Sequence, residues 1–161
     1  MVTSNELRRT MSKFATGIAV LTTIDDKDQT HALTANAITS VCLEPPLVLV
    51  CVAHSTNTYM FMELRGRFGI NILNDNQESI AKYYARKPED RRGDVQVTFS
   101  NSDGGSVMLD GSLAFLECRI EASHVHGDHT IYIAEVEKVI YSESGEPLVF
   151  FDSRFNGLNR R

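Results

Sequence analysis

The chain has 161 residues, of which 42% are hydrophobic and 23% charged, and its formal net charge is −5. This length predicts one domain, residues 1–161, with an ordinary globular composition. The negative charge argues against a nucleic-acid-binding face, and no apolar run approaches the roughly 20 residues that cross a membrane. The polar segment 1–10 does not match a secretory signal, so we expect a cytoplasmic protein without nucleic-acid or membrane partners.

Short helices and strands are predicted in the first half of the chain. "TSNELRRTMSKF" opens with a capping box, Thr3 to Glu6, and predicts a helix. "GIAVLTTI" and "THALTA" flank the polar turn "DDKDQ", which is typical of a β-hairpin. The continuous apolar run "LVLVCVA" predicts a strand that is buried on both faces.

The next segment continues this pattern. "NTYMFMELR" predicts a short helix that ends at Gly66, and "RFGINIL" predicts a strand. "QESIAKYYAR" predicts a helix that stops before Pro88. The glycine-rich stretch "RRGDVQVTFSNSDGGS" predicts an irregular excursion over the surface.

The last third favours long strands. In residues 114–122, Ala, Leu, Cys, Ile and Ala alternate with Phe, Glu, Arg and Glu, which predicts a half-buried strand. Gly127 and Asp128 form a two-residue turn, "TIYIAEVEKVIYS" returns, and "PLVFF" adds one more strand. The elements together predict a mainly β protein with an antiparallel, closed or partly closed barrel and a few short helices.

Two features bear on metal and redox chemistry. Cys42, Cys51 and Cys118 are odd in number and widely spaced, so we expect free thiols in a reducing compartment. "HVHGDH", residues 124–129, matches a zinc signature of metallo-β-lactamase-like hydrolases. No histidine follows His129 to complete a two-metal site, so exposed histidines at a hairpin tip are the favoured alternative.

Several stretches, in order, resemble the short-chain flavin reductases. They are "FATGIAVLTT", "LTANAITSVCLEPPLVLVCV", "STNT", "GRFGINIL", "QESIAKYYA", "LDGSLAFLEC", "GDHTIYIAEV" and "GEPLVFF", and they cover about residues 7–157. The resemblance implies a flavin-binding split β-barrel of Greek-key type, and a homodimer. It also implies hydride transfer from NADH or NADPH to FAD or FMN, with the reduced flavin passing to a separate monooxygenase. A non-catalytic flavin-binding electron carrier on the same barrel is the alternative.

By this resemblance, the small and hydroxyl residues before the proline pair form a wall of the flavin site. Small side chains let the backbone approach a flat ring, and hydroxyls can bond the ribityl chain and phosphate. "HSTNT" offers polar groups at a helix N-terminus for the phosphate, although Ser55 or Thr56 also suits a simple capping role. The implied flavin contacts are Thr34, Ala35, Asn36, Ala37, Ser40, Val41, Ser55, Thr56 and Asn57.

Other implied contacts involve charged loops and the late hairpin. Arg91, in "RKPEDRR", places a cation near the phosphate or the adenine, with a solvated charged loop as the alternative. Gly127, Asp128 and His129 match the family turn associated with nicotinamide. His129 is the implied catalytic residue, positioning the nicotinamide, whereas a lone hairpin histidine is more often merely exposed.

The sequence departs from the family pattern at two places. Cys42 replaces the second serine of an S-V-S triplet, which removes a hydroxyl donor. The C-terminal segment is "FFDSRFNG", so Phe151, Arg154 and Phe155 are less certain nucleotide contacts. A 2′-phosphate of NADPH would require arginines, and Arg154, Arg160 and Arg161 are candidates for that role, so the choice between NADH and NADPH stays open.

Overall fold

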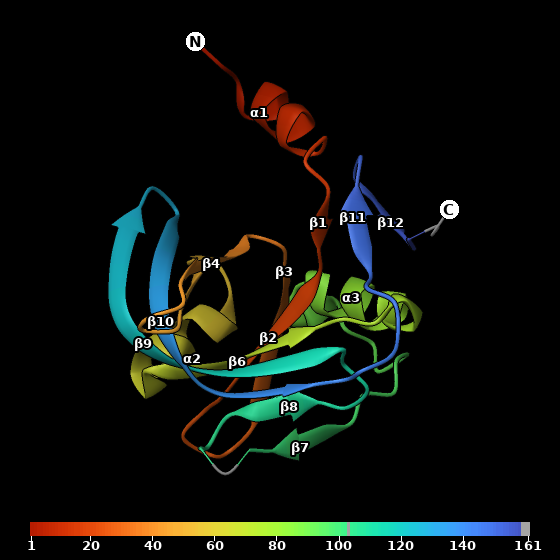
Figure 1. The fold of residues 1–161 in the computed structure, drawn as a ribbon. Helices are drawn as coiled ribbons and strands as arrows, with labels where there is room; N and C mark the ends of the chain where they lie inside the picture. Colours follow the sequence, from red (N-terminus) through yellow and green to blue (C-terminus); the bar gives the residue numbers. More distant parts are fainter. Residues whose placement is uncertain (103, 159–161) are drawn as a thin grey trace.

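A seven-stranded antiparallel sheet forms most of the molecule in the computed structural model, which describes residues 1–102 and 104–158 (Figure 1). Its strand order is β3-β2-β6-β9-β10-β5-β4. The mainly β, antiparallel fold class is therefore confirmed. The strands are β2 (Ala19–Ile24), β3 (Thr30–Ala35), β4 (Ile38–Cys42), β5 (Leu47–Ala53), β6 (Arg67–Ile72), β9 (Ala114–His126) and β10 (His129–Tyr141).

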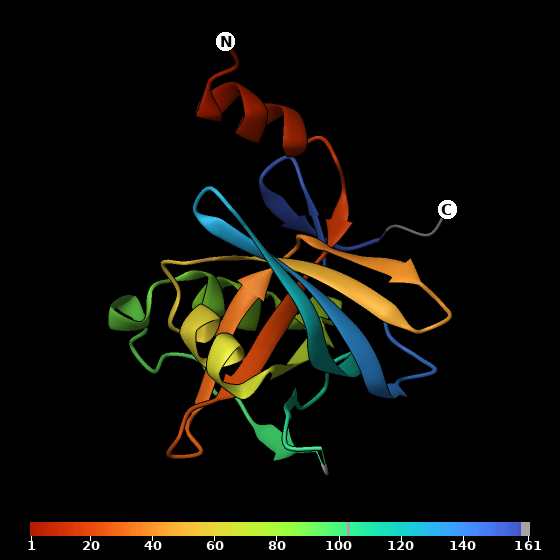
Figure 2. The same cartoon turned by 90° about the vertical axis from the view of Figure 1, so that its left-hand side faces the viewer.

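The two edges of this sheet are close neighbours in the sequence. Only Asn36 and Ala37 separate β3 from β4, so the sheet must curve to bring its first and last strands together, as the two views show (Figures 1 and 2). At this corner the Cys51 N–H donates to the Ala37 carbonyl at 3.0 Å. The hydrogen-bonded order ends at β3 and β4, so the sheet is not closed by a ladder there.

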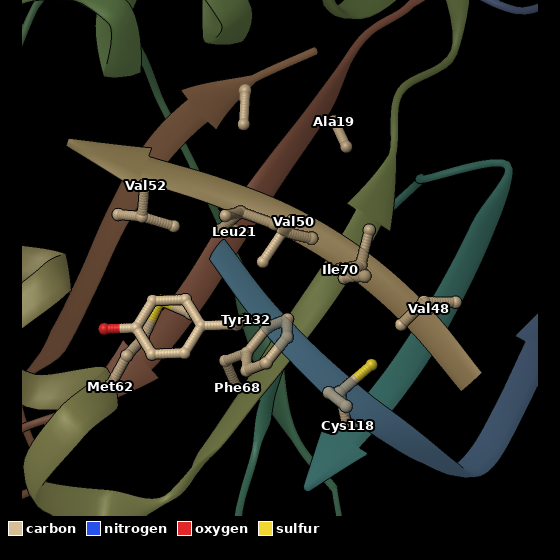
Figure 3. Packing of buried hydrophobic residues seen from close by; sticks show 12 residues of the cluster. Ala19, Leu21, Val48, Val50, Val52, Met62, Phe68, Ile70, Cys118 and Tyr132 are labelled. Carbon is tan, nitrogen blue, oxygen red and sulfur yellow. The ribbon is translucent and has the colours of Figure 1, made fainter. Parts of the chain in front are cut away.

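The main core lies inside the curve (Figure 3). Tyr132 of β10 and Phe68 of β6 are fully buried there, together with Met62 of helix α2 (Asn57–Arg65). The Tyr132 hydroxyl donates to Glu63 of α2 at 2.7 Å, which satisfies its polar end. A second cluster packs under helix α3 (Glu78–Ala85) and consists of Ile18, Val20, Ala32, Leu73, Ala81, Leu109 and Leu148.

The three predicted helices are confirmed, and their ends follow local chemistry. Helix α1 (Ser4–Met11) begins at the Thr3 capping box. Helix α2 ends at Gly66, whose φ of 64° is left-handed and therefore suits glycine. Two 3-10 turns, η1 (Asp75–Gln77) and η2 (Pro88–Asp90), flank α3. None of the helices in the described part of the chain has the length and apolar character that a membrane crossing requires.

Two small sheets complete the fold. One has the order β1 (Thr16–Gly17), β11 (Val149–Phe151), β12 (Arg154–Asn156), and the other pairs β7 (Phe99–Asn101) with β8 (Val107–Leu109). The prediction of an irregular excursion was therefore wrong for residues 99–101. These residues pair with β8 because the chain turns back between them.

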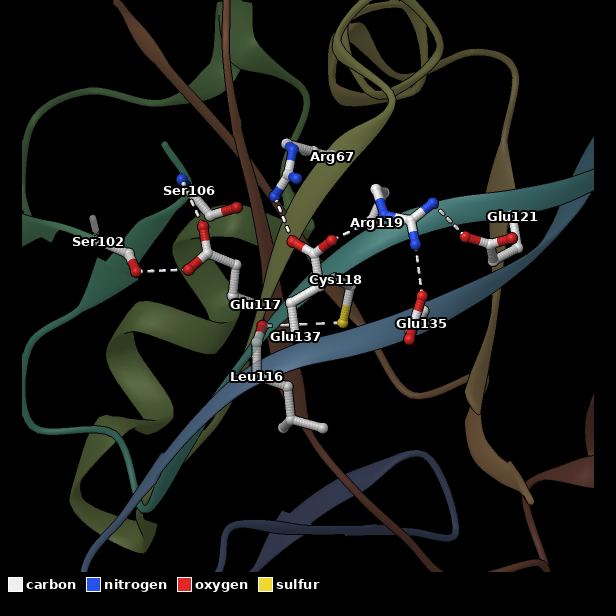
Figure 4. Close-up of polar contacts among 10 residues, drawn as sticks. All are labelled: Arg67, Ser102, Ser106, Leu116, Glu117, Cys118, Arg119, Glu121, Glu135 and Glu137. Atoms are coloured by element: carbon white, nitrogen blue, oxygen red, sulfur yellow. Dashed lines mark hydrogen bonds and ion pairs between the residues drawn. The ribbon is translucent and has the colours of Figure 1, made fainter. Parts of the chain in front are cut away.

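Two predictions of burial were also wrong. Strand β5 alternates buried and half-buried residues, because its outward face lies on the outside of the curved sheet. In β9, Phe115 and Glu117 were expected on the open face, yet they are 1% and 2% exposed. The segment around β8 covers them: Glu117 accepts from the Ser102 hydroxyl at 2.6 Å and from the Ser106 N–H at 3.1 Å (Figure 4).

Further along β9, the sheet carries an ion-pair ladder (Figure 4). The Arg119 guanidinium pairs with Glu121, Glu135 and Glu137, and Arg67 pairs with Glu137 at 2.5 Å. These hydrogen bonds and charges lower the pKa of Glu137 from its ordinary value. The side chains are partly exposed, so the ladder sets strand register more than it adds stability.

Candidate functional site

A cavity of about 330 Å³ lies between β3, the start of α2 and the segment that follows α3. Five of the residues expected from the sequence line it, and they come from three separate segments of the chain: Thr34, Ser55, Thr56, Asn57 and Arg91. The antiparallel pairing of β2 with β3 and the packing of α3 on β3 bring these segments together. The fold thus joins the implied phosphate residues into one hollow.

The cavity wall is rich in basic side chains although the chain is acidic overall. Its wall includes the basic side chains of His31, Arg86, Lys87 and Arg91, and none of the described residues lining it is acidic. The first N–H groups of α2 also point out of the helix end, where the dipole favours an anion. In a protein of net charge −5, this wall is suited to a phosphate group.

Some polar groups of the cavity are already used by the protein. The Thr34 hydroxyl donates to the Ala81 carbonyl at 2.7 Å. Thr56 caps α2 by accepting from the Tyr59 N–H at 3.2 Å, which confirms the capping interpretation. Within the described residues, Ser55 and Asn57 make no side-chain hydrogen bond. Their side chains can therefore bond a ligand without breaking an existing contact.

Arg91 supports the wall of the cavity. Its guanidinium donates to the carbonyls of Ala32 (3.1 Å), Tyr84 (3.3 Å) and Arg86 (3.2 Å), and it lies 4.9 Å from the centre of the Tyr84 ring. Burial lowers the pKa of Arg91 below its ordinary value, but an arginine keeps its charge at neutral pH. Arg91 thus fixes the end of α3 against β3 and adds positive potential.

A more apolar groove of about 360 Å³ involves the next residues of the implied flavin wall. Asn36 and Ala37 line it, and the Asn36 amide donates to the Thr16 hydroxyl at 3.2 Å. Its other lining residues are Met11, Phe14, Thr16, Ile38, Thr39, Leu49 and Cys51. The stretch from Thr34 to Ala37 therefore borders the polar cavity at one end and this groove at the other.

Three further residues of the implied flavin wall, Ala35, Ser40 and Val41, lie elsewhere. Ala35 is buried in the core, and its small side chain packs inside the sheet. Ser40 and Val41 are exposed on the edge strand β4, and neither lines the cavity or the groove.

The GDH turn has the expected two-residue geometry, with Gly127 at a φ of 60°. The His129 ring nitrogen Nδ1 lies 2.7 Å from the Asp128 carboxylate, a bond that lowers the pKa of Asp128. The His54 backbone N–H donates to the Asp128 backbone carbonyl at 3.0 Å, which joins the turn to the loop carrying Ser55. His129 is exposed, its ring is oriented by Asp128, and it lies outside the cavity wall.

The C-terminal candidates lie beside the segment that follows α1, where the Asp152 backbone N–H donates to the Ser12 carbonyl at 2.7 Å. Phe151 and Arg154 flank the β11–β12 turn, whose Asp152 pairs with Lys13 at 2.5 Å, beyond the end of α1. They line neither hollow. Arg160 and Arg161 lie outside the described residues.

Sequence reasoning missed His31 and Lys87, which also line the cavity. The loop "RKPEDRR" was weighed only as a whole, and "THALTA" was treated as half of a hairpin. At the hairpin tip, no three His, Cys, Asp or Glu side chains are grouped to hold a metal, and the same is true of residues 1–102 and 104–158 as a whole.

Comparison with known proteins gives a consistent result. Residues 11–159 match the family model described as flavin reductase like domain. The chain is 38% identical over 161 residues to an NADH-dependent flavin reductase of a Rhodococcus species, covering 98% of this chain and 88% of that one.

Solved structures agree in fold. The styrene monooxygenase flavin reductase of Pseudomonas putida has a TM-score of 0.87 at 32% identity, over 96% of this chain and 98% of that one. The NADH:FAD oxidoreductase of Streptomyces globisporus in complex with NAD and FAD fragments has a TM-score of 0.85 at 32% identity, over 96% and 92%. This chain belongs to the flavin reductase like domain family.

Proposed function

We propose that this protein is an NAD(P)H-dependent flavin reductase that reduces FAD or FMN and supplies the reduced flavin to a partner monooxygenase. The family membership and the flavin reductases among its relatives support the reaction. The similarity to the reductase of styrene monooxygenase supports the oxygenase partner.

The observation that carries the proposal is the basic-walled cavity beside the apolar groove. A flavin nucleotide has a phosphate, which suits the basic wall and the α2 N-terminus, and a flat aromatic ring with an apolar dimethylbenzene end, which suits the groove at Asn36 and Ala37. Ser55 and Asn57 would hold the phosphate, and the small residues between Thr34 and Ala37 would let the backbone approach the ring. The flavin, when bound, accepts the hydride from the nicotinamide.

The protein's own part in this reaction is to bind and orient. Asp128 accepts from Nδ1–H of His129, and in this tautomer a lone pair on Nε2 would accept from the carboxamide of a bound nicotinamide. Neither Thr34 nor Thr56 needs to act as an acid or base, since their hydroxyls serve the fold. The remaining proposed nucleotide contacts are exposed and lie outside both the cavity and the groove; they are Ser40, Val41, Phe151 and Arg154. In the proposal, a second copy of the chain or a bound nucleotide reaches them.

A homodimer is part of the proposal. Helix α1 has no buried residue, and Leu7, Met11 and Phe14 are 57%, 56% and 67% exposed. Both views show α1 projecting away from the sheet (Figures 1 and 2). Apolar surface of this kind is costly in water and is typical of an interface, so a second copy covers α1 and the outer face of β5. We also propose that the curved sheet is a split β-barrel and that the protein, with its three free cysteines, works in the cytoplasm.

The test is NADH and NADPH oxidation by the purified protein with FAD, with FMN and without flavin. We expect flavin-dependent turnover that falls at least about tenfold in His129→Ala, the size expected for a lost hydrogen bond to the substrate. His124→Ala, on the same hairpin, is the matched control and keeps full activity. Stoichiometric flavin binding without turnover would contradict the proposal and favour the electron carrier.

A further inference from the structure

His31 occupies a specific position in the basic wall of the cavity. It lies on β3, and its ring stacks on Phe61 of α2 with the ring centres 4.2 Å apart. Its Nε2 lies 3.1 Å from Oδ2 of Asp25. The ring is thus held on one side by an aromatic side chain and at one nitrogen by a carboxylate.

Asp25 is itself fixed by the backbone. Its Oδ1 accepts from the N–H groups of Lys27 at 2.8 Å and Gln29 at 2.9 Å. The bond to His31 and these two bonds lower the pKa of Asp25 to about 2, so its carboxylate is ionised at neutral pH. A carboxylate can only accept, and Nε2 of His31 must therefore carry a hydrogen whether the ring is neutral or charged.

This arrangement decides what the other nitrogen offers to a ligand. In the neutral ring, Nδ1 carries a lone pair, which repels a phosphate oxygen. In the imidazolium, Nδ1 carries a hydrogen and donates a charge-assisted bond to that oxygen. Within the described residues Nδ1 makes no hydrogen bond, so it is available to a ligand.

We propose that His31 is a phosphate-binding residue of the flavin site and that it binds the phosphate only as the imidazolium. Flavin nucleotide binding therefore takes up a proton at His31, and the affinity falls as the pH rises. This inference rests on the proposed function, because it concerns the phosphate of the same flavin.

The charges that face His31 are consistent with such coupling. Arg65 of α2 donates to the Asp25 carbonyl and lies 3.7 Å from Asp28. Arg86, Lys87, Arg91 and Tyr84 line the same cavity, and Arg86 pairs with Asp94 at 3.3 Å. A phosphate dianion bound among these cations would lie beside His31, and a nearby anion favours the imidazolium.

The experiment is isothermal titration calorimetry with FMN in buffers of different ionisation enthalpy, which counts the protons taken up on binding. For the wild type we expect proton uptake and an affinity that falls about tenfold between about pH 6 and about pH 8, the range in which an imidazole ordinarily titrates. We expect His31→Asn to bind FMN more weakly and to take up fewer protons per FMN bound. Riboflavin, which lacks the phosphate, binds the two proteins equally, and His124→Asn is the matched control.

A second variant tests the tautomer directly. Asp25→Asn keeps Oδ1 for the two backbone bonds but presents an amide N–H to Nε2, so the neutral ring now carries its hydrogen on Nδ1. We expect FMN affinity in this variant to become nearly independent of pH. Wild-type and His31→Asn proteins with equal FMN affinity at every pH would overturn this inference and leave the flavin reductase intact. A wild type that binds no flavin would overturn both.

Discussion

At the scale of single residues, buried polar side chains hold the layers together. Asn71 is fully buried in β6. Its side-chain NH₂ donates to the Val20 carbonyl at 3.0 Å and to the Thr22 hydroxyl at 3.1 Å. Its oxygen accepts from the Leu109 N–H of β8 at 2.7 Å. One side chain therefore ties the main sheet to the strand that covers it.

Asn71→Ala should destabilise the protein strongly. The substitution leaves the Leu109 N–H without a partner in a dry interior and opens a small cavity, so we expect a loss of about 2–4 kcal/mol in the free energy of unfolding. Urea unfolding followed by circular dichroism measures this loss. Asn5→Ala, at an exposed position of α1, is the control, and equal midpoints for the two variants would contradict the assigned role.

At the scale of elements, the β7–β8 hairpin packs closely on one face of the main sheet because β6 has a glycine, without a side chain, below the hairpin. A Cβ at Gly69 of β6 would lie 2.5 Å from the Thr22 hydroxyl oxygen and 2.9 Å from the Val107 carbonyl oxygen of β8. Glycine thus permits a close approach of two backbones. The buried pair Phe115 and Glu117 depends on this approach.

Gly69→Ala is expected to push β8 away from the sheet. Overpacking of a well-packed layer costs about 1–3 kcal/mol, and hydrogen exchange should quicken at the β8 amides. Gly157→Ala, where nothing lies within 4 Å of the added carbon, serves as the control. Unchanged stability together with unchanged exchange at β8 would show that the hairpin adapts without cost.

At the scale of the whole molecule, the single chain leaves apolar surface that one copy does not cover. Leu7 and Met11 of α1, and Phe14 just after it, face water, while Met11 and Phe14 border the groove at Asn36 and Ala37. A dimer that covers this surface would also close one side of the proposed ring site. Subunit assembly and flavin binding are therefore expected to be coupled.

Light scattering after gel filtration should give the mass of two chains for the wild type. The double variant Met11→Glu and Phe14→Glu is expected to elute as a monomer, because it places charges on the exposed apolar surface at the end of α1 and just after it. Thr10→Glu adds charge to the same helix without removing apolar surface and should remain a dimer. A wild-type monomer at micromolar concentration would refute the dimer.

The sequence by itself determined the local elements, because their causes are local. The capping box at Thr3, the left-handed Gly66 and the two-residue turn at Gly127 and Asp128 each act within a few residues. The strand patterns determined the mainly β class in the same way. The resemblance to flavin reductases, carried by short motifs in order, was enough to identify the family.

Only the tertiary structure decided which faces are buried and which residues meet. Phe115 and Glu117 alternate as exposed residues do, yet a hairpin from another part of the chain covers them. His31 gives no signal in "THALTA", because its role depends on Asp25, Phe61 and a cavity wall from two helices. Burial and site assembly depend on contacts between distant segments, and neither periodicity nor spacing along one strand contains them.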